Sequence, residues 1–131
     1  MRKIERFAYV KHSSQEMFLL VNDIESYPEF LPWCESTEIH ESSNEIITAS
    51  IRMERAGLKA SFTSTNHMKL YESIDLSLKD GPFNHFQGGW KFDDLGKDGS
   101  KIHFELEFEF KNKLLDMTLG PFFEDICEMM V

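Results

Sequence analysis

Apolar and polar side chains alternate along most of the chain from residue 35 to residue 110, and this period of two constrains the fold more than any other feature. Such alternation is typical of β-strands that bury one face and expose the other to water. The clearest run alternates polar residues with Ile102, Phe104, Leu106, Phe108 and Phe110. Successive strands joined by turn signals, such as Asp80-Gly81-Pro82, predict an antiparallel sheet with one apolar face.

The last two predicted strands fix their own register, because only certain pairings bring one apolar face onto the other. The same register places Lys91 beside His103 on the outer face, which three glutamates continue. Gly88-Gly89 interrupts the first of the two strands and predicts a bulge, a bend or a close approach by another group. The predicted pairs are Phe92 with Ile102, Trp90 with Phe104, Gly88 with Leu106, and Phe86 with Phe108.

Two short helices are predicted near the N-terminus, after a first strand over residues 3–11. Ser13-Ser14-Gln15-Glu16 has the spacing of a capping box, and the helix that it starts runs to about Asn22. Pro28 and Pro32 confine the second helix to roughly one turn.

The C-terminal region predicts a long helix with one apolar stripe. Gly120-Pro121 should kink or restart this helix. The chain stops at Val131 with an apolar last turn and no capping signal, so we expect the helix to be truncated. The stripe consists of Leu115, Leu119, Phe122, Ile126 and Met129. Together the elements predict one α+β domain over residues 1–131.

The connection Val21–Cys34 is unusually apolar. It carries Tyr27, Phe30 and Trp33, whereas solvated loops normally carry small polar residues. An apolar connection must pack on something, and we interpret this one as a lid over an apolar cavity. Twelve Phe and seven Met suit an adaptable apolar pocket, although a Phe-rich core explains the same surplus.

Charge and targeting signals narrow the class of protein. The net charge of −9 argues against binding to DNA or to an anionic membrane surface, because both depend on clustered Lys and Arg. We find no signal peptide and no apolar run long enough to span a bilayer. Cys34 and Cys127 fit no CxxC motif, so we expect a cytoplasmic protein whose cysteines are reduced core residues.

Sequence motifs for catalysis and metal binding are absent. HExxH, GxSxG, GxGxxG and the P-loop do not occur, and the five histidines are scattered. The carboxylates that can be placed lie on predicted outer faces or in turns. We therefore predict no catalytic residues and no metal site.

The order of these elements and several separated motifs resemble the START-like superfamily, and within it the RatA and coenzyme Q-binding family. The most specific segments are Leu20–Ile24 and Tyr27–Cys34, supported by Asp80–Phe83, Gly88–Phe92 and Phe108–Leu114. The resemblance implies a helix-grip fold, in which a curved antiparallel sheet wraps around a long C-terminal helix with two short N-terminal helices.

The resemblance also implies a function. It favours a non-enzymatic protein that binds coenzyme Q or a related isoprenoid lipid and supports respiration, with no required cofactor and a place peripheral to the inner membrane. The alternative is a RatA-type ribosome-association toxin that binds the large ribosomal subunit and blocks subunit joining, with a small antitoxin as a further candidate partner. A cyclase-like enzyme is the most distant alternative.

Ser64 and Asn66 share a predicted strand face with Phe62 and could donate hydrogen bonds to the carbonyls of a quinone head. Alternatively, both polar residues mark the exposed end of the strand. The remaining candidates would line the ligand tail. The full set of candidate ligand-binding residues is Phe30, Trp33, Phe62, Ser64, Asn66, Trp90, Phe104, Phe108, Leu119, Phe122 and Ile126.

Overall fold

The computed structural model describes residues 2–55 and 57–129, without the side chains of Arg55, Phe122, Phe123 and residues 125–129. The elements follow the predicted order. They are β1 (Arg2–Val10), α1 (Ser14–Asn22), the 3-10 turn η1 (Ile24–Ser26), α2 (Tyr27–Phe30), β2 (Cys34–Ser42), β3 (Ile46–Arg55), β4 (Leu58–Lys69), β5 (Ser73–Asp80), β6 (Phe83–Asp94), the 3-10 turn η2 (Gly96–Asp98), β7 (Ser100–Phe110) and α3 (Lys113–Met129).

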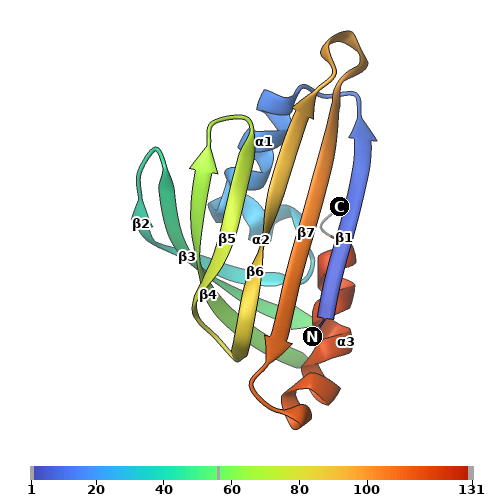
Figure 1. Ribbon diagram of the computed structural model, residues 1–131. Coiled ribbons are helices and arrows are strands. Elements are labelled where there is room, and N and C mark those ends of the chain that lie inside the picture. Colours follow the sequence, from blue (N-terminus) through green and yellow to red (C-terminus); the bar gives the residue numbers. More distant parts are fainter. Residues whose placement is uncertain (1, 56, 130–131) are drawn as a thin grey trace.

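The seven strands form one antiparallel sheet in the order β1-β7-β6-β5-β4-β3-β2. The first strand pairs with the last, and the remaining strands form a meander (Figure 1). The sheet twists strongly from β7 to β2, and α1 and α2 lie behind it in this view. No helix among the described residues is long and apolar enough to cross a membrane.

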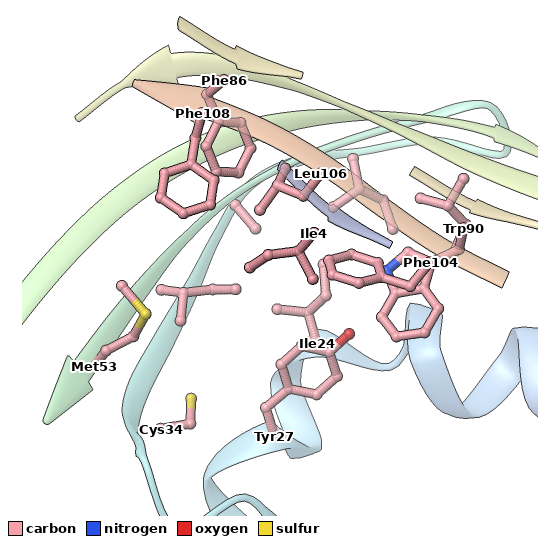
Figure 2. Packing of buried hydrophobic residues seen from close by; sticks show 14 of the residues in the cluster. Ile4, Ile24, Tyr27, Cys34, Met53, Phe86, Trp90, Phe104, Leu106 and Phe108 are labelled. Carbon is pink, nitrogen blue, oxygen red and sulfur yellow. The ribbon is translucent and has the colours of Figure 1, made fainter. Parts of the chain in front are cut away.

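The predicted pairing of β6 with β7 is confirmed at all four apolar pairs, and Lys91 lies opposite His103 as expected. The apolar side chains of both strands point to the helical side, where Trp90, Phe104 and Leu106 face Ile24 and Tyr27 (Figure 2). Phe18 of α1 packs edge-on against Phe92, with ring centroids 5.6 Å apart. Burial of this one sheet face under the helices forms the core.

The predicted start and end of α1 are confirmed. Ser13 Oγ accepts a hydrogen bond from the Glu16 backbone N–H at 3.1 Å, and the Glu16 carboxylate accepts one from the Ser13 N–H at 3.4 Å. This reciprocal pair satisfies two backbone donors that would otherwise lack partners. Helix α2 is a single turn that ends at Phe30, as the two prolines predict.

Helix α3 is anchored to the start of β1. The Arg2 guanidinium lies 2.8 Å from Asp116 and 3.0 Å from Glu124, two residues that are eight positions apart and share one helix face. Gly120 lies between them, and a side chain there would collide with the guanidinium. The sequence predicts a kink or a restart of this helix at Gly120-Pro121; α3 runs from Lys113 to Met129 with Pro121 inside it, so it does not restart there. The end of the chain, where truncation is expected, lies outside the described residues.

Candidate functional site

An apolar chamber lies between the connection Val21–Trp33 and the inner face of the sheet. Its volume is about 50 Å³, enough for roughly four water-sized groups without rearrangement. Strands β3 to β7 supply its floor and walls, and α1, η1 and α2 supply its cover. The lining residues are Val21, Asn22, Ile24, Tyr27, Trp33, Ile51, Met53, Phe62, Ser64, Asn66, Ile74, Leu76, Phe86, Trp90, Phe104 and Leu106.

The apolar connection covers this chamber, as its composition predicts. Tyr27 and Trp33 are 6% and 3% exposed and line the chamber from above. The Tyr27 hydroxyl donates to the Val21 carbonyl, and the Glu54 N–H donates to the Trp33 carbonyl at 2.9 Å. These bonds tie the cover to α1 and to β3. Phe30 differs from its two neighbours, because its side chain is 47% exposed and does not line the chamber.

Ser64 and Asn66 are buried, with 4% and 5% exposure, and both line the chamber. The alternative that they mark an exposed strand end is therefore wrong. The reason is that β4 is paired on both sides, by β3 and β5, at these two positions. The Ser64 hydroxyl donates to Asn66 Oδ1 at 2.8 Å, so the two polar groups partner each other.

Aromatic rings form one wall of the chamber. Trp90 and Phe104 lie across the β6–β7 pair with ring centroids 4.5 Å apart, and Phe62 and Phe86 are 5.2 Å apart. Such rings offer flat apolar faces to a planar ligand group. Six predicted site residues thus meet at the chamber: Trp33, Phe62, Ser64, Asn66, Trp90 and Phe104.

The other predicted residues lie elsewhere. Phe108 is fully buried in the core, where its ring packs edge-on against Phe83 and Phe110. Leu119 is half-buried against the core and does not line the chamber. The side chains of Phe122 and Ile126 lie outside the described part of the chain. Phe108 shares the face of Phe104, but it lies four residues along the strand, beyond the chamber.

Several lining residues were not predicted. Four of them belong to the period-two pattern, which predicts their inward face but not how deep in the sheet they lie: Ile51, Met53, Ile74 and Leu76. Asn22 and Ile24 belong to the family-like segment Leu20–Ile24, but no periodicity marks them as lining residues, because they lie at a helix end and in a single 3-10 turn.

Among the described lining residues, Tyr27 is the one side chain that carries an ionisable group. Burial raises the pKa of its hydroxyl above the usual value. Just outside the chamber, burial raises the pKa of the Cys34 thiol to about 11. Neither group is suited to acid–base chemistry at neutral pH.

A second apolar hollow of about 100 Å³ lies beside the chamber and shares Val21, Tyr27 and Trp90 with it. We call it the side hollow. It opens between α1, α2 and the inner face of β1, and exposed Phe30 forms part of its rim. The two spaces are therefore separated by a few side chains only.

The outer face of the sheet is polar. Ligand atoms of Glu5, His103 and Glu105 lie within 4.8 Å of one another there. The His103 Nε2 atom is 3.6 Å from the Glu5 carboxylate, and Glu5 is 56% exposed. Contacts between exposed polar side chains of this kind contribute little to stability.

A curved antiparallel sheet whose apolar chamber is covered by α1, η1 and α2 is a START-like fold. The family described as "Polyketide cyclase / dehydrase and lipid transport" matches residues 10–131, and the chain belongs to this family. Among solved structures, a START superfamily protein from Mycobacterium smegmatis superposes with a TM-score of 0.77 at 18% identity, over 98% of this chain and 93% of that one. The Zhui aromatase/cyclase from Streptomyces gives a TM-score of 0.76 at 19% identity, over 85% and 69%.

Curated relatives place the chain more narrowly. The persistence and stress-resistance toxin PasT of Escherichia coli O6:H1 is 43% identical over all of this chain and 83% of that protein. The ribosome association toxin RatA of Escherichia coli K12 is 41% identical over the same shares. The mitochondrial coenzyme Q-binding protein COQ10 of Drosophila melanogaster is 27% identical over 92% of this chain and 52% of that protein.

Proposed function

We propose that the chain is a non-enzymatic protein that binds coenzyme Q or a related isoprenoid lipid, peripheral to the inner membrane, in support of respiration. The observation that carries the proposal is the apolar chamber closed by Tyr27 and Trp33, with the Ser64–Asn66 pair as a polar spot in its wall. Buried apolar pockets with a few placed polar groups are the usual form of small-molecule sites. The name of the Drosophila relative supports the same ligand class.

The side hollow gives the ligand a path out. A quinone head in the chamber could pass its isoprenoid tail between Tyr27 and Trp90 into this hollow, whose lining is apolar. The chamber must expand to admit a ring, and flexible Met53 in its wall suits that change.

A cyclase-like enzyme is less well supported. Catalysis of that kind needs an acid–base group turned into the cavity. Among the described lining residues, only Tyr27 carries an ionisable group, and its hydroxyl is bound to the Val21 carbonyl.

The test is binding of decylubiquinone to the purified chain, with two variants of the same strand and residue type. Ser64→Leu fills the chamber, so we expect decylubiquinone affinity to fall at least about tenfold. Ser61→Leu is the control, because Ser61 lies on the opposite, exposed side of β4. Equal affinity of both variants, or no binding by the unmodified chain, would contradict the proposal.

A second candidate function is association with the large ribosomal subunit and inhibition of subunit joining. The observation that favours it is the name of the relatives that are about 41% identical over the whole chain. The net charge of −9 opposes broad contact with rRNA. Basic residues near the N-terminus, namely Arg2, Lys3 and Arg6, could form a local contact patch for RNA. This patch is weakened, because Arg2 is held by Asp116 and Glu124.

The outer face offers a better contact surface for RNA. Phe7 and Tyr9 are 59% and 66% exposed, and the Lys101 ammonium lies 5.0 Å and 5.8 Å from their ring centroids. Exposed aromatic rings beside a cation can stack on unpaired bases. We expect overexpression of the unmodified chain to lower the 70S peak in sucrose gradients, and Phe7→Ala/Tyr9→Ala to restore it. An unchanged 70S peak with the unmodified chain would sink this candidate.

A further inference from the structure

Among the described residues, three buried side-chain polar atoms lack a hydrogen-bond partner: Asn22 Oδ1, Trp33 Nε1 and His85 Nε2. His85 lies on the outer face, 3.6 Å from the Glu107 carboxylate. The other two belong to lining residues of the chamber. Buried polar atoms are nearly always satisfied in native proteins, so an unsatisfied atom on each of two residues that line one chamber is a reason to look for a ligand there.

Trp33 is the more informative of the two. Only 3% of its surface is exposed. An indole N–H can only donate a hydrogen bond. A ligand that satisfies this N–H must therefore bring an acceptor atom to the Trp33 side of the chamber. Asn22 is less selective, since rotation of its amide by 180° presents either an acceptor or a donor.

The Ser64–Asn66 pair has less need of a hydrogen bond from a ligand. The Ser64 proton is already donated to Asn66 Oδ1, so neither of these two groups is left without a partner. The polar group best placed to bind a ligand therefore belongs to the connection Val21–Cys34 and not to the sheet. Trp33 is well fixed for that role, because its carbonyl accepts from Glu54 of β3 and Cys34 directly after it begins β2.

The described lining carries no carboxylate, ammonium or guanidinium group. A carboxylate or phosphate ligand would be desolvated there without a counter-charge, which is strongly unfavourable. A neutral ligand with an oxygen acceptor avoids this cost. The rings of Trp90 and Phe104 offer a flat wall to the part of the ligand that carries the oxygen.

We propose that Trp33 is the specificity-determining residue of the chamber: its indole N–H donates to a carbonyl oxygen on a neutral apolar ring, and so favours quinone- or ketone-bearing ligands over pure hydrocarbons and anionic lipids. This inference rests on the proposed binding function, and it assigns the polar contact to the connection.

The experiment compares duroquinone with durene, which has the same tetramethyl ring without the two carbonyls. We expect Trp33→Phe, which keeps a ring and removes the N–H, to weaken duroquinone binding about 5- to 10-fold and to leave durene binding unchanged. A merely structural Trp33 would weaken the binding of both ligands alike, whatever stability the variant loses to the smaller ring.

An NMR measurement on the unmodified chain makes the test independent of that variant's folding. The sequence has two tryptophans, so a Trp90→Phe variant identifies the Trp33 indole N–H signal. We expect duroquinone to shift this signal downfield and durene to shift it less. Duroquinone could bind without shifting the Trp33 signal and with equal affinity for the unmodified chain and the Trp33→Phe variant. In that case the Trp33 inference is wrong and quinone binding stands. If neither ligand binds, the proposed function itself fails.

Discussion

At the scale of the residue, the apolar connection divides into side chains with different surroundings. Tyr27 and Trp33 turn inward over the chamber, whereas Phe30, three residues before Trp33, is 47% exposed at the rim of the side hollow. Tyr27 and Phe30 lie one helical turn apart on α2, and their rings pack edge-on with centroids 5.9 Å apart. Phe30 is therefore the outer, exposed ring of this pair and Tyr27 the buried one. Cys34 follows directly and is buried beneath the same cover.

Cys34 should be chemically inert in the folded protein. Burial raises the pKa of its thiol to about 11, so at pH 8 only roughly one molecule in a thousand carries the reactive thiolate. We expect reaction with a disulfide reagent at pH 8 to be far slower than for a free cysteine, and to become fast in urea. The measurement uses a Cys127→Ser background, so that one thiol reports. Rapid labelling without urea would contradict the burial of Cys34.

At the scale of the element, the β6–β7 pair depends on close approach at Gly88. A Cβ atom there would collide with the backbone of β7, at the Glu105 carbonyl oxygen and Leu106 Cα. Backbone cannot move aside as a flexible side chain can. The absence of a side chain therefore permits the register that brings Trp90 over Phe104.

Gly88→Ala should destabilise the protein by at least about 2 kcal/mol, because it forces two paired strands apart. The control is Gly96→Ala, where a new Cβ atom meets open space and the positive φ of 65° alone is strained. That control should cost about 1 kcal/mol. Urea unfolding measures both, and equal losses would show that the close approach is unimportant.

Helix α3 should be held to β1 less firmly in acid. The hydrogen bond from Arg2 holds the pKa of Asp116 below its usual value, so this carboxylate stabilises the fold above its unfolded pKa of about 3.9. The contribution is lost as the pH falls through the lower, folded pKa. We expect Asp116→Asn to lower the urea midpoint at pH 7 and to lower it less at pH 3. The effect should vanish in an Arg2→Ala background, and its persistence there would exclude the ion pair as the cause.

At the scale of the whole molecule, α1 and α2 lie on one face of the sheet (Figure 1). The buried apolar side chains of the strands belong to that face. Two phenylalanines on neighbouring strands show the difference between the two faces. Phe108 of β7 is fully buried, and Phe7 of β1 is 59% exposed under the Lys101 ammonium.

Phe108→Ala should cost about 3–5 kcal/mol of unfolding free energy, because it leaves a cavity in a packed aromatic cluster. Phe7→Ala should cost about 1 kcal/mol or less, because it removes an exposed ring and one weak cation–π contact. Thermal or urea unfolding of the two variants gives the comparison. A large loss from Phe7→Ala would indicate that the outer face is covered in the native protein.

The sequence by itself determined the register of β6 with β7, the capped α1, the one-turn α2 and the apolar connection. These features depend on side chains within one element or on two adjacent strands, where the alternation of apolar residues leaves one favourable pairing. Only the tertiary structure decided which apolar residues line the chamber and that Phe108 fills the core. It also decided that Ser64 and Asn66 are buried hydrogen-bond partners and that the Trp33 N–H has no hydrogen-bond partner. Alternation fixes the face on which a side chain lies but not its depth, and a chamber is a gap between elements that are distant in sequence.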